Sequence, residues 1–187
     1  MASAVARIAF LPSLLYNVLL EKASLRRWYD RIDQTVVLGA LPFRGVSRRL
    51  VETENVRGVI TMNEEYETRL FCYTAEEWQA LGVEQLRLST VDLTGVPTQE
   101  HLQKGVKFAL KHQELGHSVY IHCKAGRSRS ATMAAAYLIQ VHNWSPHEAK
   151  EYIKNIRPQT LIRRSQFEAL EQFHAWVRNQ SPVQSGG

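Results

Sequence analysis

The chain has 187 residues, of which 44% are hydrophobic and 22% charged, so it can bury one core and is too apolar for a disordered protein. Its formal net charge of +5 favours anionic partners, and phosphate esters, acidic lipid surfaces and nucleic acid all fit that charge. Its two cysteines are too few for a disulfide scaffold, and no C-x-x-C pair or H-E-x-x-H sequence indicates a metal site. We therefore expect one globular protein of a reducing compartment, with no metal and no other cofactor.

The first 34 residues differ from the rest of the chain. Residues 1–20 contain one basic residue, Arg7, and no acid. A helix over the apolar run 8–20 would be about 20 Å long, which is too short for a hydrocarbon core of roughly 30 Å. At about 100° per residue along the N-terminal segment, four polar positions share one sector: Ser3, Arg7, Ser13 and Asn17. The pattern predicts a mitochondrial targeting or membrane-surface segment over 1–34, and a secretory signal and a helix packed on the protein body are the alternatives.

From residue 35 the pattern alternates between strands and helices. Short apolar segments predict four buried strands: Val36–Leu41, Gly58–Met62, Gln85–Thr90 and Ser118–His122. Helical spacing and capping signals predict five helices: Ala75–Leu81, Gln99–Leu115, Ser128–His142, Ser145–Ile156 and Arg164–Arg178. The sequence therefore predicts an α/β fold with a mainly parallel central sheet flanked by helices. It forms one domain over 35–178, followed by a flexible tail over 179–187.

The most informative stretch begins at Val119 and reads VYIHCKAGRSRSATMAAAYLI. A buried strand leads into Cys123, a loop with a glycine follows, and an alanine-rich helix begins near Arg129. A loop that curls around a helix N-terminus points its backbone N–H groups inward, and the helix dipole adds positive potential. Such a loop binds a phosphate dianion and favours the thiolate form of a cysteine. The predicted phosphate-binding residues are Lys124, Ala125, Gly126, Arg127, Ser128 and Arg129.

Four side chains in and beside this loop have distinct expected roles. Cys123 is the candidate nucleophile toward phosphorus, and the planar guanidinium of Arg129 matches two phosphoryl oxygens. Ser130 can donate a hydrogen bond to the sulfur when a phosphocysteine breaks down. His122 is expected to orient the loop through hydrogen bonds, and for this residue a buried structural histidine is an equal alternative.

Cleavage of a phosphate ester also needs a general acid, because an alkoxide is a poor leaving group. Asp92 follows the strand predicted over 85–90, so it should lie on the same rim of the parallel sheet as the Cys123 loop. An acidic run follows another strand end: Glu64, Glu65, Tyr66 and Glu67. We expect this run to orient Arg129 or to border the mouth of the site, with a solvated loop as the alternative.

The segment around Cys123 resembles the dual-specificity branch of the protein tyrosine phosphatase superfamily. Members of that branch carry H-C-x5-R-[S/T] after a strand and an aspartate about thirty residues earlier. The loop matches this pattern at His122, Cys123, Arg129 and Ser130, and Asp92 lies 31 positions before the cysteine. The resemblance implies the dual-specificity phosphatase fold and a phosphocysteine intermediate.

Longer stretches are similar to the mitochondrial phosphatidylglycerophosphate phosphatases within that branch: GVITMNEEYETR, VEQLRLSTVDLTGVPT and HCKAGRSRSATM. This resemblance implies removal of the terminal phosphate of phosphatidylglycerophosphate in cardiolipin synthesis, at the matrix side of the inner mitochondrial membrane. It also makes the run 64–67 a border of the active site. Lys124 and Arg127 suit a strongly anionic head group. We expect an anionic phospholipid and a membrane surface as partners, and no nucleic acid.

A dual-specificity protein phosphatase and a phosphoinositide phosphatase are the alternative functions, because the same chemistry serves both. A catalytically silent phosphate-binding module would not need Cys123, Arg129 and Asp92 together. A sulfurtransferase or an arsenate-type redox enzyme would need neither Asp92 nor Ser130. Two basic clusters are further candidates for docking on anionic lipid: Arg44, Arg48 and Arg49, and Arg157, Arg163 and Arg164.

Overall fold

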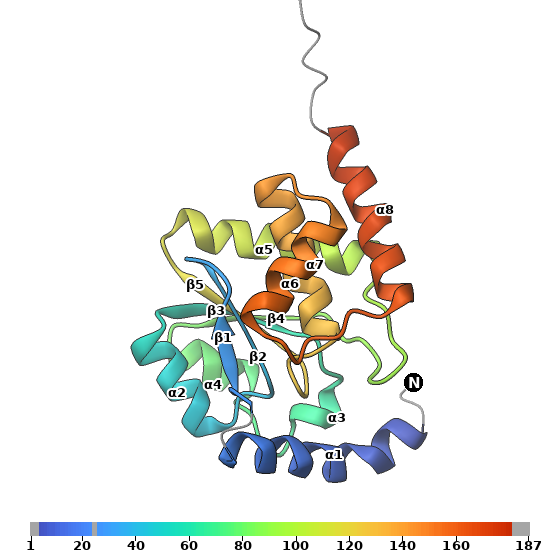
Figure 1. Ribbon diagram of the computed structural model, residues 1–187. Coiled ribbons are helices and arrows are strands. Elements are labelled where there is room, and N and C mark those ends of the chain that lie inside the picture. Colours follow the sequence, from blue (N-terminus) through green and yellow to red (C-terminus); the bar gives the residue numbers. More distant parts are fainter. Residues whose placement is uncertain (1–3, 24–25, 181–187) are drawn as a thin grey trace, which may run out of the picture.

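A computed structural model describes residues 4–23 and 26–180, which form a five-stranded sheet with helices on both faces (Figure 1). In spatial order the strands are β1 (Tyr29–Arg31), β2 (Val36–Gly39), β5 (Ser118–His122), β3 (Val56–Thr61) and β4 (Glu84–Arg87). β1 is antiparallel to β2, and every other neighbouring pair is parallel. The predicted mainly parallel sheet is confirmed, and β1 adds an edge strand that precedes the predicted domain boundary at residue 35.

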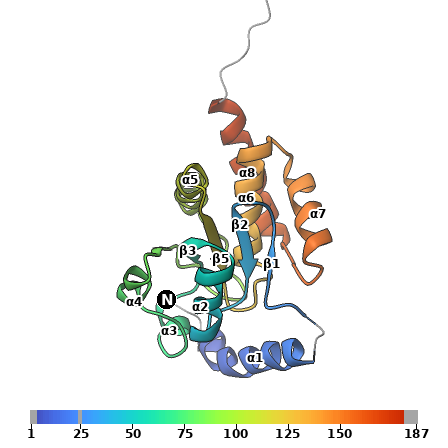
Figure 2. The same cartoon turned by 90° about the vertical axis from the view of Figure 1, so that its left-hand side faces the viewer.

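The two faces of the sheet are covered by different sets of helices (Figure 2). One face carries α5 (Gln99–Glu114), α6 (Arg129–His142), α7 (Pro146–Ile156) and α8 (Arg164–Gln180). The larger core lies on this side and includes Ile121, Leu138 and Phe173. The other face carries α2 (Arg44–Thr53) and α4 (Ala75–Ala80), whose Leu50 and Trp78 belong to a second buried cluster. All five predicted helices are present, and α2 and the one-turn helix α3 (Glu65–Thr68) are additions to them.

Local signals explain why several of these helices begin where they do. α7 follows a capping box in which Ser145 accepts from the amide of Glu148, and Pro146 occupies its first turn. α4 follows a second capping box, between Thr74 and Glu77. α2 lacks a side-chain cap, and its apolar residues are few, which is why the pattern did not predict it.

The N-terminal helix α1 (Ala4–Lys22) lies across one end of the sheet (Figure 1). It packs through Phe10 and Leu14 on a cluster that contains Leu41 and Cys72. Its other side exposes large apolar side chains, each between 56% and 78% accessible: Ile8, Leu11, Leu15, Tyr16 and Leu19. Within the described part of the chain, no helix has both the length and the apolar character needed to cross a bilayer. The predicted tail lies largely outside the described residues.

Candidate active site

The strand, loop and helix predicted around Cys123 are all present. β5 ends at His122, the loop over 123–128 follows, and α6 begins at Arg129. Gly126 has a φ of 62°, and a Cβ atom at this position would lie 2.4 Å from the carbonyl carbon of Gly39. The loop can therefore close against the end of β2 only because this residue has no side chain.

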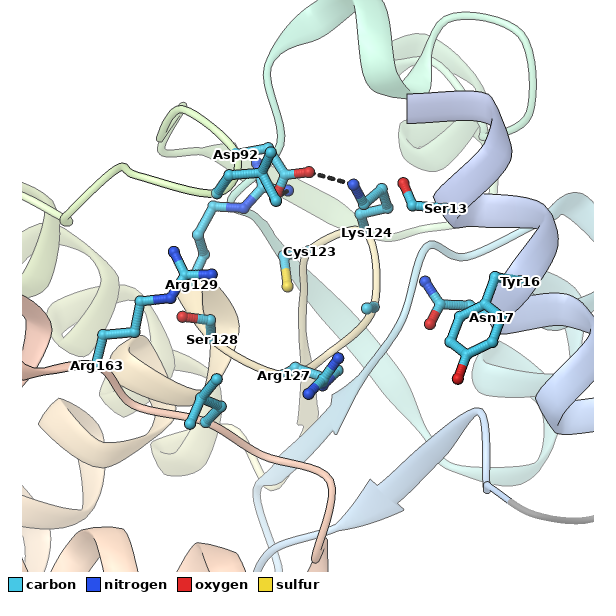
Figure 3. Close-up of a pocket in the computed structure, with 13 residues that line it drawn as sticks. Ser13, Tyr16, Asn17, Asp92, Cys123, Lys124, Arg127, Ser128, Arg129 and Arg163 are labelled. Atoms are coloured by element: carbon cyan, nitrogen blue, oxygen red, sulfur yellow. Dashed lines mark hydrogen bonds and ion pairs between the residues drawn. The ribbon is translucent and has the colours of Figure 1, made fainter. Parts of the chain in front are cut away.

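The loop forms the floor of a pocket with a volume of about 180 Å³ (Figure 3). Seven of the predicted site residues line this pocket: Asp92, Cys123, Lys124, Ala125, Arg127, Ser128 and Arg129. Ser130 and Glu67 lie behind the floor and contact Cys123 and Arg129, respectively. The structure therefore brings together the predicted nucleophile, phosphate-binding arginine and general acid.

Cys123 is buried, and its Sγ lies 3.2 Å from the Oγ of Ser130. Burial by itself would raise the pKa of this thiol. The positive charge of Arg129 and hydrogen bonds from Ser130 and from the loop backbone outweigh burial, so the pKa of Cys123 is lowered. The site therefore favours the thiolate, which is the nucleophilic form of cysteine.

The buried guanidinium of Arg129 is held by two carboxylates and one carbonyl. It donates to both carboxylate oxygens of Glu67, at 2.8 and 3.0 Å, and to the carbonyl of Thr90 at 2.8 Å. One of its terminal nitrogens lies 2.9 Å from Oδ1 of Asp92. Burial disfavours the charge, but hydrogen bonds to Glu67 and the negative charges nearby raise the pKa of Arg129. This side chain therefore stays charged and is fixed in place.

The acidic run after β3 forms the one-turn helix α3 (Glu65–Thr68), and one member reaches Arg129. Glu67 is fully buried and makes the bidentate contact. Glu64 caps the helix, Glu65 is exposed, and Tyr66 packs edge-on against a phenylalanine of α1. The sequence predicted that this run orients Arg129 or borders the mouth of the site. Glu67 has the first of these roles, since it holds Arg129 in position.

Asp92 lies in the loop between β4 and α5, on the rim where the sequence predicted it. Its carboxylate accepts a hydrogen bond from Nζ of Lys124 and faces Arg129 (Figure 3). Burial would raise the pKa of Asp92, but the charges of Arg129 and Lys124 outweigh burial and lower it. Asp92 is therefore ionised in this arrangement, and it can act as an acid only after the two cations have engaged another anion.

His122 supports the strand end and does not line the pocket. Its Nε2 lies 2.9 Å from Oγ1 of Thr61, and its carbonyl accepts from the amide of Met62 at 3.0 Å. Burial lowers the pKa of His122 to about 3, so the ring is neutral. These contacts agree with the structural alternative for this residue, because they hold the end of β5 against β3.

A buried ion pair supports the Cys123 loop from behind. Arg157 is 1% exposed and pairs with Asp30 at 2.6 Å. Its guanidinium also donates to the carbonyls of Gly126, at 2.8 Å, and of Ala125, at 3.3 Å. In a trans peptide the N–H points opposite to the C=O, so the amides of Gly126 and Arg127 turn away from Arg157. The sequence placed Arg157 in a lipid-docking cluster, and its burial contradicts that expectation.

One wall of the pocket is formed by α1, which the sequence did not assign to the site. Ser13, Tyr16 and Asn17 line the pocket opposite Arg163, another residue absent from the predicted site (Figure 3). Ser13 and Asn17 belong to the polar sector predicted for this helix. That sector therefore borders the site. The sequence signal for this position was the pair of polar residues Ser13 and Asn17, which lie four positions apart and so share one side of the helix.

Cys72 has a structural position away from this pocket. It packs with Phe10, Leu14 and Leu41, it is a free thiol, and burial raises its pKa to about 12. Cys123 is also free. Within residues 4–23 and 26–180, no group of three or more His, Cys, Asp or Glu side chains is arranged to hold a metal ion.

The family model of the dual specificity phosphatase catalytic domain matches residues 48–175, which include the loop, the acid and the acidic run. The chain belongs to the dual specificity phosphatase family. It is therefore a phosphatase that uses a cysteine, and both the predicted fold and the predicted class of enzyme are confirmed.

Named relatives of this phosphatase cover most of its length. It is 65% identical to phosphatidylglycerophosphatase and protein-tyrosine phosphatase 1 of Rattus norvegicus, over 90% of this chain and 89% of the relative. It is 62% identical to the protein of the same name from Homo sapiens, over 92% and 87%. The crystal structure of PTPMT1 in complex with PI(5)P is 67% identical, with a TM-score of 0.81, and covers 82% of this chain and 98% of that one.

Proposed function

We propose that this phosphatase removes the terminal phosphate of phosphatidylglycerophosphate to give phosphatidylglycerol, a step in cardiolipin synthesis. The names of the rat and human relatives support this substrate. The observation that carries the proposal is the apolar rim of the pocket, where Tyr16, Leu93 and Leu161 are 56%, 41% and 48% exposed. Exposed apolar side chains beside a phosphate site suit a lipid, whose acyl chains leave the pocket at this rim.

In the first step the Cys123 thiolate attacks the terminal phosphorus. A P–S bond forms, and the bond between phosphorus and the glycerol oxygen breaks. Arg129 and the loop amides bind the phosphoryl oxygens, whose negative charge grows in the transition state. Asp92 donates its proton to the leaving oxygen, so a hydroxyl group departs instead of an alkoxide.

In the second step a water molecule hydrolyses the phosphocysteine. The Asp92 carboxylate takes a proton from the water, the water oxygen bonds to phosphorus, and the P–S bond breaks. Ser130, which lies 3.2 Å from the sulfur, donates a hydrogen bond to the departing thiolate. Inorganic phosphate leaves, and Cys123 returns to the thiolate.

Asp92 acquires its catalytic proton when the substrate enters. Lys124 and Arg129 lower the pKa of its carboxyl group in the structure described here. A phosphate dianion in the loop neutralises part of the charge of both cations and brings its own negative charge near the carboxyl group, so the pKa of Asp92 rises and its protonation is favoured. Substrate binding and protonation of the acid are therefore linked.

We further propose that the enzyme works at the matrix side of the inner mitochondrial membrane, held there by α1. The exposed apolar side of α1 supports adsorption to a bilayer, and three basic residues lie at the C-terminal end of this helix and just after it in the sequence: Lys22, Arg26 and Arg27. Each basic residue near an anionic surface contributes around 1 kcal/mol. Residues 1–34 fused to a fluorescent reporter are expected to direct it to mitochondria, and a cytosolic or secreted reporter would refute this localisation.

The substrate is tested by comparing kcat/KM on phosphatidylglycerophosphate, phosphatidylinositol 5-phosphate and a phosphotyrosyl peptide, each with Cys123→Ser as the blank. We expect the highest value for phosphatidylglycerophosphate. The solved relative in complex with PI(5)P favours a phosphoinositide as the second candidate. A higher value for the phosphoinositide or for the peptide would overturn the proposed substrate.

Membrane attachment is tested by replacing two exposed leucines of α1, Leu11→Ser with Leu15→Ser. Sedimentation with cardiolipin-containing vesicles should fall, while turnover of soluble nitrophenyl phosphate should not change. Leu115→Ser is the matched control, since Leu115 is exposed as much as Leu15 but lies at the end of α5. Unchanged sedimentation of the double variant would refute attachment through α1.

A further inference from the structure

The pocket contains more positive charge than one phosphate group requires. Four cationic side chains line it: Lys124, Arg127, Arg129 and Arg163. Lys124 and Arg129 are paired with carboxylates of the site. Neither Arg127 nor Arg163 has a carboxylate within ion-pair distance among the described residues. Two guanidinium groups therefore remain for a second anion.

Hydrogen bonds hold the side chain of Arg127 and the backbone of Arg163. Nε of Arg127 donates to the carbonyl of Gln159 at 2.9 Å, which leaves the terminal nitrogens of this side chain for other partners. The amide of Arg163 donates to Oε1 of Gln166 at 3.0 Å, and the same oxygen accepts from Oγ of Ser128 at 2.7 Å. One buried glutamine thus ties the segment that carries Arg163 to the phosphate-binding loop.

The two arginines lie on different sides of Cys123 in the pocket (Figure 3). Arg163 extends from the segment before α8 toward Cys123, and Arg127 lies on the loop between Cys123 and α1. Asn17 of α1 lines the pocket beyond Arg127, and its side-chain amide can donate a further hydrogen bond. Cys123 and Arg129 are buried, whereas Arg127 is half-buried and Arg163 is exposed. A group held between the two arginines would therefore lie nearer the solvent than a phosphate bound on Cys123 and Arg129.

The arginines also repel one another. Burial first, and then the charges of Arg26 and Arg163, lower the pKa of Arg127. Cations held together without a counter-charge interact unfavourably, and an anion bound between them removes that repulsion. Guanidinium groups are suited to this task, because their planar N–H donors match two oxygens of one phosphate.

On the basis of the lipid phosphatase function above, we propose that Arg127 and Arg163 form a second anion subsite for the phosphodiester of the same head group. The substrate class is then a glycerophospholipid whose head group carries a terminal monoester phosphate. Its monoester lies on Cys123, its diester lies between the two arginines, and its acyl chains pass the apolar rim. A substrate with one phosphate makes no use of this subsite.

The test uses soluble head groups, so that membrane attachment plays no part. We would measure kcat/KM on deacylated phosphatidylglycerophosphate, which has two phosphates, and on glycerol 3-phosphate, which has one. Arg163→Gln should lower kcat/KM on the two-phosphate compound by about tenfold or more, because one charge-assisted contact is lost. On glycerol 3-phosphate the change should stay within about twofold.

Arg164→Gln is the matched control, because this neighbouring arginine pairs with Glu168 and does not line the pocket. It should leave both rates unchanged. Arg163 is exposed and its side chain makes no hydrogen bond to the described residues, so its replacement tests the subsite without disturbing the fold. An equal loss on both compounds, or no loss on either, would overturn the subsite. A wild-type enzyme that prefers another two-phosphate lipid would overturn the proposed substrate but not the subsite.

Discussion

Replacement of Glu67 by glutamine probes the part of the site that the substrate does not touch. The two carboxylate oxygens of Glu67 accept four hydrogen bonds, two from Arg129, one from Nδ2 of Asn63 at 2.7 Å and one from the amide of Glu64 at 2.9 Å. All four partners are donors, and each oxygen accepts from two of them. Whichever way the amide of Glu67→Gln is turned, its NH2 group faces two donors.

The size of the effect follows from burial of both partners. Removing one charge of a buried ion pair costs roughly 3–5 kcal/mol, because the other charge is left uncompensated. Asp92 remains 2.9 Å from Arg129 and still compensates part of the positive charge of Arg129. We therefore expect a loss of about 3 kcal/mol in the free energy of unfolding. For a chain of this length that corresponds to a fall in Tm of roughly 6–12 °C.

Thermal unfolding followed by circular dichroism measures this fall, and kcat/KM on nitrophenyl phosphate measures the accompanying loss of activity. Activity should drop because Arg129 is no longer held in position to bind two phosphoryl oxygens. Glu65→Gln is the control, since Glu65 lies on the same short helix but is exposed. If Glu67→Gln lowers Tm no more than Glu65→Gln does, the bidentate contact between Glu67 and Arg129 does not stabilise the protein.

Three further substitutions test individual roles. Cys123→Ser should abolish turnover and keep vanadate binding, because a hydroxyl group is far less ionised than a thiol; measurable turnover would contradict the nucleophile. Asp92→Asn should slow hydrolysis of glycerol 3-phosphate by about a hundredfold or more and spare nitrophenyl phosphate, whose leaving group needs no proton; equal losses would give Asp92 another role. Lys124→Met should raise the pKa of Asp92, measured by NMR titration of its carboxyl carbon, because one of two cations that lower it is removed. Lys104→Met is the control, and identical pKa values for Asp92 in both variants would exclude that influence of Lys124.

The sequence predicted the elements whose contacts are local. Cys123, Arg129 and Ser130 lie within one strand–loop–helix unit, so their spacing alone brings them together. Asp92 could be placed because parallel strands end on one rim of the sheet, so residues that directly follow different strands lie close together. The prediction of Glu67 was weaker, since four neighbouring residues could face the site and only packing selects one of them.

Contacts between distant segments could not be predicted in this way. Arg157 and Asp30 lie 127 positions apart, and a charged residue without a visible partner is expected at the surface. The polar sector of α1 was visible, but a helical pattern does not specify which other element the sector meets. Ser13 and Asn17 therefore became site residues only in the folded chain, as did Arg163.

Support of the loop by Arg157 has a thermodynamic consequence for anion binding. The carbonyls of Ala125 and Gly126 are held by a buried guanidinium, so the amides of the same peptide units keep their direction whether or not a phosphate is present. A loop that is already in its binding shape loses little conformational entropy when the ligand arrives. The heat of phosphate binding, measured by calorimetry, should then contain little contribution from ordering of the loop. The affinity of the Cys123→Ser variant for phosphate should also depend on Arg157, although this side chain does not touch the ligand.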